Sequence, residues 1–368
     1  MGTTRKIMAS LLNPPRQYAR MVVWDNLLNT RHARGDKRFL VVHHPSESPF
    51  MYDLLLHWLA MFFPDVRALF ELHTLPFHVR DWSRVALYVP WLQDPVQAWS
   101  RTTYWLANRL AARCDRHDIP VINRVDRLAN ASKSSGARLI GSVGFRTPQM
   151  APITDVEEFR RTRLGLPLPL FVREDQGHGG PMLRADTDAE VRALPIESLR
   201  RPVAVELIDV RSPGDGLFRK FRYVLAGDVG VRQTLHVTQD WATHGTGTIF
   251  SEALREEEVA FIEGVEPEHA RFLAAREALG LDFVAFDYGI DVTGRTVVWE
   301  ANPFPFLHFV GGRRRYRMAA TERVLAAMAR LYLSRSGMDV PADLDTILGN
   351  PRTEPALTTS GPTAGCQP

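Results

Sequence analysis

The sequence predicts a mixed α/β and α+β fold, with a small α/β domain first and a larger α+β part after it. From Phe39 to Asn123, short apolar runs alternate with helical segments, as strands and helices do around a parallel sheet. After Leu168, strands follow one another across short turn signals, as in antiparallel hairpins. With 45% hydrophobic and 24% charged residues in a chain of 368, the composition is that of an ordinary globular protein of two or three domains.

The α/β domain is expected at residues 37–132, after a basic N-terminal arm at residues 1–36. Apolar residues at helical spacing predict helices at Met51–Phe63 and Val96–His117. Short continuous apolar runs predict buried strands. These strands are expected at Phe39–Val42, Val85–Val89 and Pro120–Asn123.

The α+β part is expected to contain six strands and three helices. The strands are predicted at Leu168–Arg173, Val203–Asp209, Phe218–Ala226, Gly230–Val237, Phe283–Asp291 and Thr296–Asn302. The helices are predicted at Glu252–Glu263, Pro267–Leu279 and Tyr316–Leu333. From Ser336 the chain is rich in proline, threonine and glycine, which predicts a flexible tail at residues 336–368.

Composition excludes several classes of protein. Lys+Arg 45 against Asp+Glu 42 leaves a net charge of +3, too small to indicate a nucleic-acid-binding face. The two cysteines, Cys114 and Cys366, have neither metal-site nor disulfide spacing, which fits a reducing compartment. The apolar stretch at residues 54–63 is too short for a membrane span of about 20 residues. We therefore expect a cytoplasmic protein without nucleic-acid or membrane partners, and a homodimer as the commonest oligomer.

The segment Asp287–Asn302 predicts a hairpin with carboxylates on one face. A two-residue turn at Thr293-Gly294 would place Asp287 opposite Glu300, with Asn302 further along the same face. The other face would be apolar, pairing Phe286 with Ala301, Tyr288 with Trp299 and Ile290 with Val297. Directly opposed side chains lie about 4.5–5.5 Å apart, and two carboxylates so close repel unless a cation joins them. Oxygen ligands of this kind suit Mg²⁺, although a solvated hairpin face is the alternative.

Two further features could hold phosphate. Arg173 ends a strand that runs into the glycine-rich loop Gly177-His178-Gly179-Gly180, whose backbone N–H groups could cradle phosphate oxygens. The second is a basic hairpin, with a three-residue loop expected at residues 227–229 that pairs Phe221 with Leu235 and Leu225 with Val231. One face of this hairpin would collect Lys220, Arg222, Arg232 and His236. An ordinary turn and a solvated strand face are the respective alternatives.

These features, in this order, resemble the ATP-grasp superfamily, whose members clamp ATP between two α+β lobes. Its C-terminal lobe carries an Asp, a Glu thirteen residues later and an Asn two further on, which matches Asp287, Glu300 and Asn302. The resemblance implies an N-lobe at residues 133–200 with the glycine-rich loop. It also implies a C-lobe at residues 201–335 with the metal site, and the α/β domain at residues 37–132 as the domain that usually precedes the clamp.

The resemblance also implies roles for residues upstream of the metal site. Lys133 would contact phosphate, and Arg173 stands where most members have lysine. The hinge that holds adenine and ribose would be Glu206, Leu207, Ile208 and Asp209, with Glu206 and Asp209 as the matching acids. A subgroup of bacterial ATP-grasp proteins has a similar glycine loop and a similar basic strand, which Arg219, Lys220 and Arg222 match. Some of its members carry tetratricopeptide repeats, and this sequence shows no such repeat.

The implied activity is an ATP- and Mg²⁺-dependent carboxylate ligase, with Mn²⁺ as a substitute metal, that works through an acyl phosphate. Its partners would be a small-molecule or peptide carboxylate and an amine, or less readily a thiol. Well-known peptide-forming members have an arginine two residues before the metal Asp, where this chain has Ala285, so Arg222 or Arg232 would take its role, with Lys220 and His236 nearby. The alternatives are a phosphotransferase and an ATP-binding regulatory module with little turnover.

The run Arg313-Arg314-Arg315-Tyr316-Arg317 follows the metal triad. It could receive an acidic substrate or the carboxylates of a peptide. The alternative is the solvated beginning of the last helix.

Overall fold

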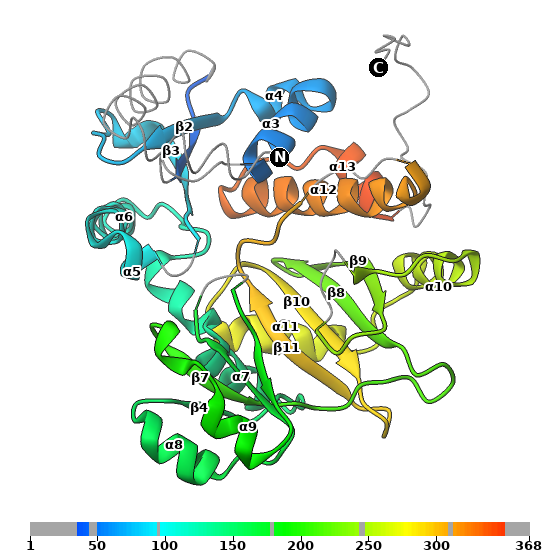
Figure 1. Ribbon diagram of the computed structural model, residues 1–368. Coiled ribbons are helices and arrows are strands. Elements are labelled where there is room, and N and C mark those ends of the chain that lie inside the picture. The colour runs from blue at the N-terminus through cyan, green and yellow to red at the C-terminus, as the bar shows by residue number, and fades with distance from the viewer. Residues whose placement is uncertain are drawn as a thin grey trace, which may run out of the picture.

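The computed structural model describes residues 35–43, 50–93, 96–176, 180–242, 247–307 and 312–349. These residues form three sheets, as Figure 1 shows. The first sheet is parallel, in the order β2 (Phe70–Thr74), β1 (Arg38–His43) and β3 (Val85–Trp91). The second has the order β4 (Met150–Pro152), β7 (Pro202–Glu206), β5 (Leu170–Glu174) and β6 (Leu183–Ala185). The third has the order β11 (Thr296–Asn302), β10 (Phe283–Ile290), β8 (Phe218–Ala226) and β9 (Val229–Thr238).

Helices cover these sheets. In chain order they are α3 (Phe50–Phe62), α4 (Pro64–Arg67), α5 (Val96–Trp99), α6 (Arg101–Asp115), α7 (Lys133–Gly141), α8 (Val156–Thr162), α9 (Asp188–Ala193), α10 (Glu252–Glu263), α11 (His269–Leu279), α12 (Arg317–Arg335) and α13 (Ala342–Gly349). Short 3-10 helices lie at Trp82–Arg84, Val125–Ala131, Arg163–Gly165, Ile196–Ser198 and Gly312–Arg314. Helix α12 lies between the first and third sheets (Figure 1), and its buried residues share one apolar core with residues of both. This core therefore joins the first domain to the part that follows it.

Two predictions about individual elements were wrong, and several elements were not predicted. The helix expected at Val96–His117 is broken at Ser100, whose hydroxyl accepts a hydrogen bond from the backbone N–H of Thr103 and caps α6. Of Pro120–Asn123, only Val121 forms a β-bridge, to Tyr88. Among the elements that were not predicted are strand β2, which follows a helix with little turn signal, and helix α7, whose beginning at Lys133 is flanked by serines at positions 132, 134 and 135.

The structure also moves two predicted boundaries. Strand β7 pairs with β4 and β5, so it belongs to the second sheet and not to the part expected to begin at residue 201. Residues 342–349 form α13, whose Leu344 and Ile347 are buried in the core beside α12, so the flexible tail does not begin at residue 336. The N-terminal arm up to residue 34 and the tail from residue 350 lie outside the described residues.

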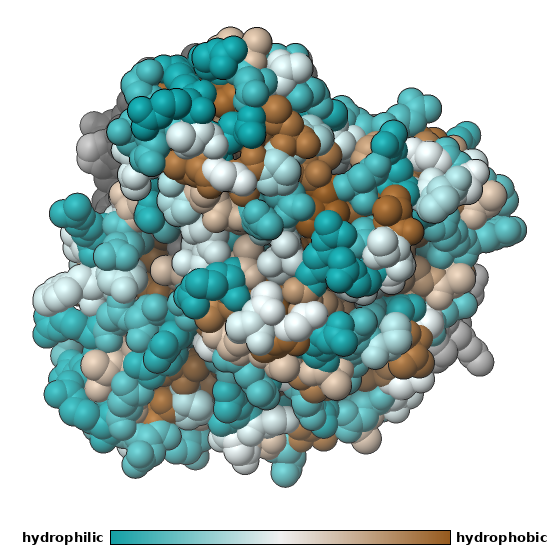
Figure 2. Space-filling view, turned by 90° about the horizontal axis from the view of Figure 1, so that it is seen from below, coloured by the Kyte–Doolittle hydropathy of each residue, from teal (hydrophilic) through white to brown (hydrophobic). Residues whose placement is uncertain are grey.

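The surface seen from the side of the second sheet is mostly polar, and apolar side chains gather in a band across its upper half (Figure 2). Among the described residues, no helix combines the length and the apolar character needed to cross a membrane.

Asn123 connects the first domain to the third sheet. Its backbone has a positive φ of 54°, a conformation that asparagine tolerates better than most residues. Its Oδ1 accepts hydrogen bonds from the N–H groups of Asp282 (2.8 Å) and Phe283 (3.0 Å), and its Nδ2 donates to the carbonyl of Phe283 (2.7 Å). This side chain thus satisfies the backbone where β10 begins.

Replacing Asn123 with alanine is expected to lower the free energy of unfolding by about 2–4 kcal/mol, because buried N–H groups lose their acceptor and alanine disfavours a positive φ. Urea denaturation measures this change. Asn130→Ala is the matched control, since Asn130 donates a single hydrogen bond, to the carbonyl of Leu279, and should cost about 1 kcal/mol. Equal losses in the two variants would contradict the role assigned to Asn123.

Candidate functional site

A cavity of about 380 Å³ lies between the second and third sheets. Ten of the residues predicted from the sequence line it: Lys133, Arg173, Glu206, Leu207, Ile208, Lys220, Arg222, Asp287, Glu300 and Asn302. They come from α7, from β5, from the end of β7, and from β8, β10 and β11. The cavity therefore gathers predicted residues that lie as far apart in the sequence as Lys133 and Asn302.

The acidic residues of the predicted metal site occupy one row across the third sheet. Asp287 pairs with Glu300 on one side, as predicted, and with Arg222 on the other. Because cross-strand partners project from the same face, these three side chains lie side by side. Asn302 pairs with Ala285, two positions along the same face from the Asp287–Glu300 pair.

Phe286 pairs with Ala301 as predicted, but the other two predicted pairs of the hairpin were wrong. An extra residue, Trp299, forms a bulge in β11, so Tyr288 pairs with Val298 and Ile290 with Thr296. Trp299 consequently lines the cavity and does not join the apolar face. It also covers Gly289, where an added Cβ would lie 2.4 Å from the indole ring. Strand β10 ends at Ile290 and β11 begins at Thr296, so the turn spans residues 291–295 and is longer than the two residues expected.

Both carboxylates are neutralised by cations from neighbouring elements. Arg222 forms a bidentate pair with Asp287 at 2.7 and 2.9 Å, and the Lys220 Nζ lies 3.3 Å from the same carboxylate. The Lys133 Nζ lies 2.8 Å from Glu300 Oε1. Burial alone would raise the pKa of Asp287, but the charges of Arg222 and Lys220 hold it below its ordinary value. Asp287 is therefore ionised at neutral pH although it is buried.

The donor set fits a hard divalent cation. Two carboxylates and an amide oxygen project from adjacent positions of one hairpin, and Mg²⁺ is commonly held by one or two carboxylates together with substrate phosphates. The Asn302 Oδ1 accepts a hydrogen bond from the N–H of Phe304 (2.8 Å), which orients its amide. Among the described residues, no cluster of three or more His, Cys, Asp or Glu side chains could hold a metal. The triad is thus a site of two acids that needs further oxygen ligands.

Lys133 is held at the beginning of α7 and is only 5% exposed. The hydroxyl of Ser132 caps this helix. Asp175, which follows β5, accepts hydrogen bonds from Ser134 N (2.7 Å) and Ser134 Oγ (2.9 Å), and its carbonyl accepts one from the N–H of Lys133 (2.8 Å). These contacts join the end of β5 to the helix that carries the lysine. Neither Ser134 nor Asp175 was predicted, although Asp175 stands two residues after Arg173 in the predicted phosphate segment.

Arg173 lies on β5 and faces the cavity. Its Nε is buried and has no hydrogen-bond partner among the described residues, so this guanidinium keeps capacity for an anion. Of the predicted glycine-rich loop, Gly180 is described and has a positive φ of 86°. Gly177, His178 and Gly179 lie outside the described residues.

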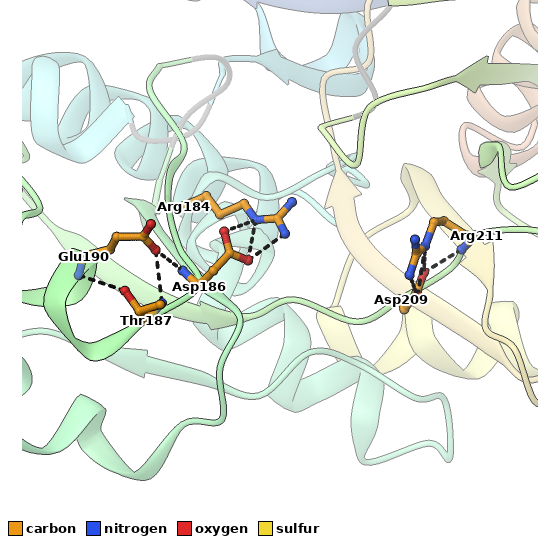
Figure 3. Close-up of polar contacts among 6 residues, drawn as sticks. All are labelled: Arg184, Asp186, Thr187, Glu190, Asp209 and Arg211. Atoms are coloured by element: carbon orange, nitrogen blue, oxygen red, sulfur yellow. Dashed lines mark hydrogen bonds and ion pairs between the residues drawn. The ribbon is translucent and has the colours of Figure 1, made fainter.

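The predicted hinge divides into residues that face the cavity and one that does not. Glu206 pairs with Gln149 through its backbone N–H (2.9 Å) and accepts a hydrogen bond from the N–H of Gln149 with its carboxylate (2.9 Å). Asp209 does not line the cavity, contrary to the expected contact with ribose. It forms an ion pair with Arg211, at 2.5 Å for the closest atoms (Figure 3). The hydrogen bond from Arg211 lowers the pKa of Asp209.

Figure 3 also draws the residues around the end of β6, which belongs to the same sheet as β7. Arg184 pairs with Asp186 (2.7 Å), and Thr187 and Glu190 form the capping box of α9.

The basic hairpin places two of its four predicted residues in the cavity. Lys220 and Arg222 line it, and Phe221 pairs with Leu235 as predicted. An extra residue, Gln233, then forms a bulge in β9, so Leu225 pairs with Gly230 and not with Val231. Ala226 pairs with Val229, which leaves a two-residue loop where three residues were expected.

This bulge corrects the placement of Arg232. It pairs with Tyr223 and so lies on the opposite face of the sheet from Arg222, where it forms an ion pair with Glu266 (3.1 Å) and lies over the ring of Phe261. Arg232 therefore cannot act with Lys220 and Arg222 from this position.

His236 pairs with Lys220 across the strands but does not line the cavity. Its Nδ1 lies 3.1 Å from Thr248 Oγ1. Burial, and after it the charges of Arg317, Lys220 and Arg222, lower the pKa of His236 to about 3. His236 is therefore neutral at physiological pH.

The lowered pKa of His236 predicts a pH dependence of stability. In the unfolded chain, His236 is protonated below its ordinary pKa of about 6.5, whereas in the folded chain it stays neutral down to about pH 3. The free energy of unfolding therefore falls as the pH falls through this window. His236→Gln removes this contribution. Between about pH 7 and about pH 5, the variant is expected to lose about 1–2 kcal/mol less than the wild type, measured by urea denaturation at both pH values. Parallel losses in the two proteins would contradict the prediction.

Aromatic residues complete the cavity and were largely missed. Phe171 and Trp241 line it with their ring centroids 5.1 Å apart, and Phe304 and Phe306 line it after β11. Trp241 lies beyond the end of β9, at Thr238. Phe171 stands two residues before Arg173, and Phe304 and Phe306 stand two and four residues after Asn302. Because alternate residues of an extended chain point to the same side, this spacing was the available signal.

Comparisons with known proteins bear on the fold. No family model matches the sequence, and neither does any curated protein. The structure is similar to PsnB, an ATP-grasp ligase solved with a minimal precursor, with a TM-score of 0.51 at 12% identity over 82% of this chain and 100% of that one. It is similar to the D-Ala:D-Ser ligase VanG of Enterococcus faecalis, with a TM-score of 0.50 at 14% identity over 82% and 99% of the chains.

A third similar structure is a RiPP-associated ATP-grasp ligase of Chryseobacterium gregarium in complex with ADP and a leader and core peptide. Its TM-score is 0.50 at 10% identity, over 81% of this chain and 97% of that one. These similarities confirm the fold that the resemblance implied.

Proposed function

We propose that this chain, which has the ATP-grasp fold, is an ATP- and Mg²⁺-dependent carboxylate ligase that forms carbon–nitrogen bonds. The observation that carries the proposal is the row Arg222–Asp287–Glu300 inside the cavity, with Lys133, Lys220 and Arg173 around it. Two carboxylates suit a metal, and four cations suit a polyphosphate, so the combination favours a nucleotide bound with its metal.

The cavity residues divide by chemistry into three groups. Glu206, Leu207 and Ile208 would hold the adenosine part, beside the aromatic Phe171 and Trp299. Lys133, Arg173 and the loop that ends at Gly180 would hold the phosphates. Asp287, Glu300 and Asn302 would hold Mg²⁺, or Mn²⁺, which favours the same oxygen ligands. The metal, when bound, would offset the negative charge of the phosphates.

In the proposed reaction, a substrate carboxylate oxygen attacks the γ-phosphorus of ATP, and the bond to the β-phosphate oxygen breaks to release ADP. An amine nitrogen then attacks the carbonyl carbon of the acyl phosphate, and inorganic phosphate leaves. Arg222 and Lys220 face the cavity and would stabilise the transferring phosphoryl group. They would take the role that the resemblance gives to an arginine at the position of Ala285. His236 would stay neutral behind Lys220, and Arg232 and Asp209 have no part in this scheme.

A trapping experiment tests the ligase reaction. The full chain is incubated with ATP, Mg²⁺ and hydroxylamine together with a panel of free amino acids, dipeptides and peptides that contain Asp or Glu. A ligase is expected to produce ADP and a hydroxamate with an accepted carboxylate, and ¹⁸O from that carboxylate should appear in the released phosphate. A stable phosphorylated product without hydroxamate would indicate a kinase instead. Nucleotide binding without ADP formation across the panel would indicate a regulatory module.

We place the protein in the cytoplasm, where ATP is available and thiols stay reduced. This fits Cys114, which is buried and free.

A further inference from the structure

The size of the cavity bears on the second substrate. A volume of about 380 Å³ is near the lower end of the range of about 300–1,000 Å³ that single-ligand pockets span. A nucleotide would occupy most of it. On the proposed function, the carboxylate substrate must therefore reach the phosphates from the protein surface, across residues at the rim of the cavity.

Three consecutive arginines before α12 have no acidic partner among the residues that the structure describes. The arginine cluster, Arg313, Arg314 and Arg315, precedes α12, and the first turn of that helix contains no acidic residue. Arg313 and Arg315 are exposed, and none of the three forms an ion pair with a described residue. Glu252, the acidic residue near Phe250, is paired with Arg255. Because a helix N-terminus carries positive partial charge, three cations there repel it and one another without compensation.

A continuous set of contacts joins the arginine cluster to the cavity. Arg314 Nη2 donates a hydrogen bond to the carbonyl of Thr248 (3.5 Å), and Arg313 lies over the ring of Phe250. The hydroxyl of Thr248 contacts His236, which pairs with Lys220 at the cavity wall. The cluster is thus linked to Lys220 through Thr248 and His236.

The same segment of chain also presents an apolar contact. Phe306 lines the cavity and remains 56% exposed. Between β11 and α12 the chain therefore offers a large exposed aromatic side chain at the cavity and, a few residues later, three uncompensated guanidinium groups. Guanidinium groups bind carboxylates through paired N–H···O hydrogen bonds. A ligand that uses both features must carry apolar and acidic groups spaced along an extended chain.

We propose that the arginine cluster and Phe306 dock an acidic polypeptide segment, which carries the carboxylate that reacts at the cavity. This proposal rests on the proposed function and narrows its substrate to a polypeptide. The recognition is electrostatic and is therefore expected to weaken as salt concentration rises.

Fluorescence anisotropy of a labelled peptide of alternating glutamate and leucine tests the docking site on the full chain. Binding to the wild type is expected to be at least about tenfold tighter than to the triple variant Arg313→Ser, Arg314→Ser, Arg315→Ser, because three arginine–carboxylate contacts of about 0.5 kcal/mol each are lost. The matched control, Arg161→Ser, Arg192→Ser, Arg200→Ser, removes three exposed arginines elsewhere and should stay within about twofold of the wild type. Phe306→Ser should weaken binding of the glutamate–leucine peptide more than binding of a glutamate–serine peptide.

Several results would overturn the proposal. These are equal peptide affinities for the two triple variants, absence of peptide binding to the wild type, or tighter binding of a single-stranded DNA oligonucleotide than of the peptide. Affinity for the non-hydrolysable analogue adenylyl imidodiphosphate with Mg²⁺ is measured on the same preparations. If the wild type binds the nucleotide but not the peptide, the docking proposal alone is wrong. If the wild type does not bind the nucleotide, the proposed function itself is wrong.

Discussion

Replacing Asp287 with asparagine is expected to change the affinity for adenylyl imidodiphosphate in opposite directions with and without Mg²⁺. Without the metal, Arg222 and Lys220 are no longer neutralised by Asp287, so the nucleotide phosphates should bind about tenfold more tightly. With Mg²⁺, the loss of a carboxylate ligand should weaken nucleotide binding by at least about tenfold relative to the wild type. A general loss of structure would weaken nucleotide binding under both conditions and could not produce tighter binding in the absence of Mg²⁺.

Isothermal titration calorimetry in EDTA and in Mg²⁺ measures both affinities. Asp228→Asn is the matched control, because it removes the same charge from the β8–β9 turn of the same sheet, where the Asp228 side chain is 81% exposed and lies 3.4 Å from Arg330. The control should reproduce the wild-type values within about twofold. If Asp287→Asn loses affinity equally with and without Mg²⁺, Asp287 is not a metal ligand.

Replacing Glu258 with alanine is expected to lower the free energy of unfolding by about 3–5 kcal/mol, the largest stability effect that we predict. Glu258 is 4% exposed and lies on α10. Its carboxylate forms an ion pair with Arg317 (2.7 Å) and accepts hydrogen bonds from the hydroxyl of Tyr316 (2.5 Å) and the N–H of Leu235 (2.9 Å). It therefore joins α10, α12 and β9, and its loss leaves the buried Arg317 guanidinium without a counter-charge.

The neighbouring residue supplies the control for Glu258. Glu257 forms an ion pair with Arg219 from a side chain that is 36% exposed, so Glu257→Ala should cost no more than about 1 kcal/mol. Urea denaturation gives both values. If Glu258→Ala does not fold, Glu258→Gln keeps two hydrogen-bonding positions and should show an intermediate loss. Equal losses for the alanine variants of Glu257 and Glu258 would show that the buried ion pair adds no more to the free energy of unfolding than the exposed one.

Much of the third sheet could be predicted because its strands carry their own signals. Phe218–Ala226 and Thr296–Asn302 have the predicted bounds, and so does helix Glu252–Glu263. The alternation of apolar and polar residues also placed Asp287 opposite Glu300 correctly. These are local properties, set by spacing along one or two neighbouring strands. The role of each residue in catalysis stays a prediction, which the experiments above test.

What the sequence by itself determined was the order of elements, the fold class and most of the side chains that meet in the cavity. Only the tertiary structure decided which face the residues beside a bulge occupy, because a single extra residue in a strand shifts the pairing on one side of it and turns those residues to the other face. The bulge at Gln233 sends Arg232 away from Arg222, and the bulge at Trp299 turns an expected core residue into cavity wall. The tertiary structure also decided that Arg222 lies beside Asp287, since strands 65 residues apart pair through long-range packing that no local spacing encodes.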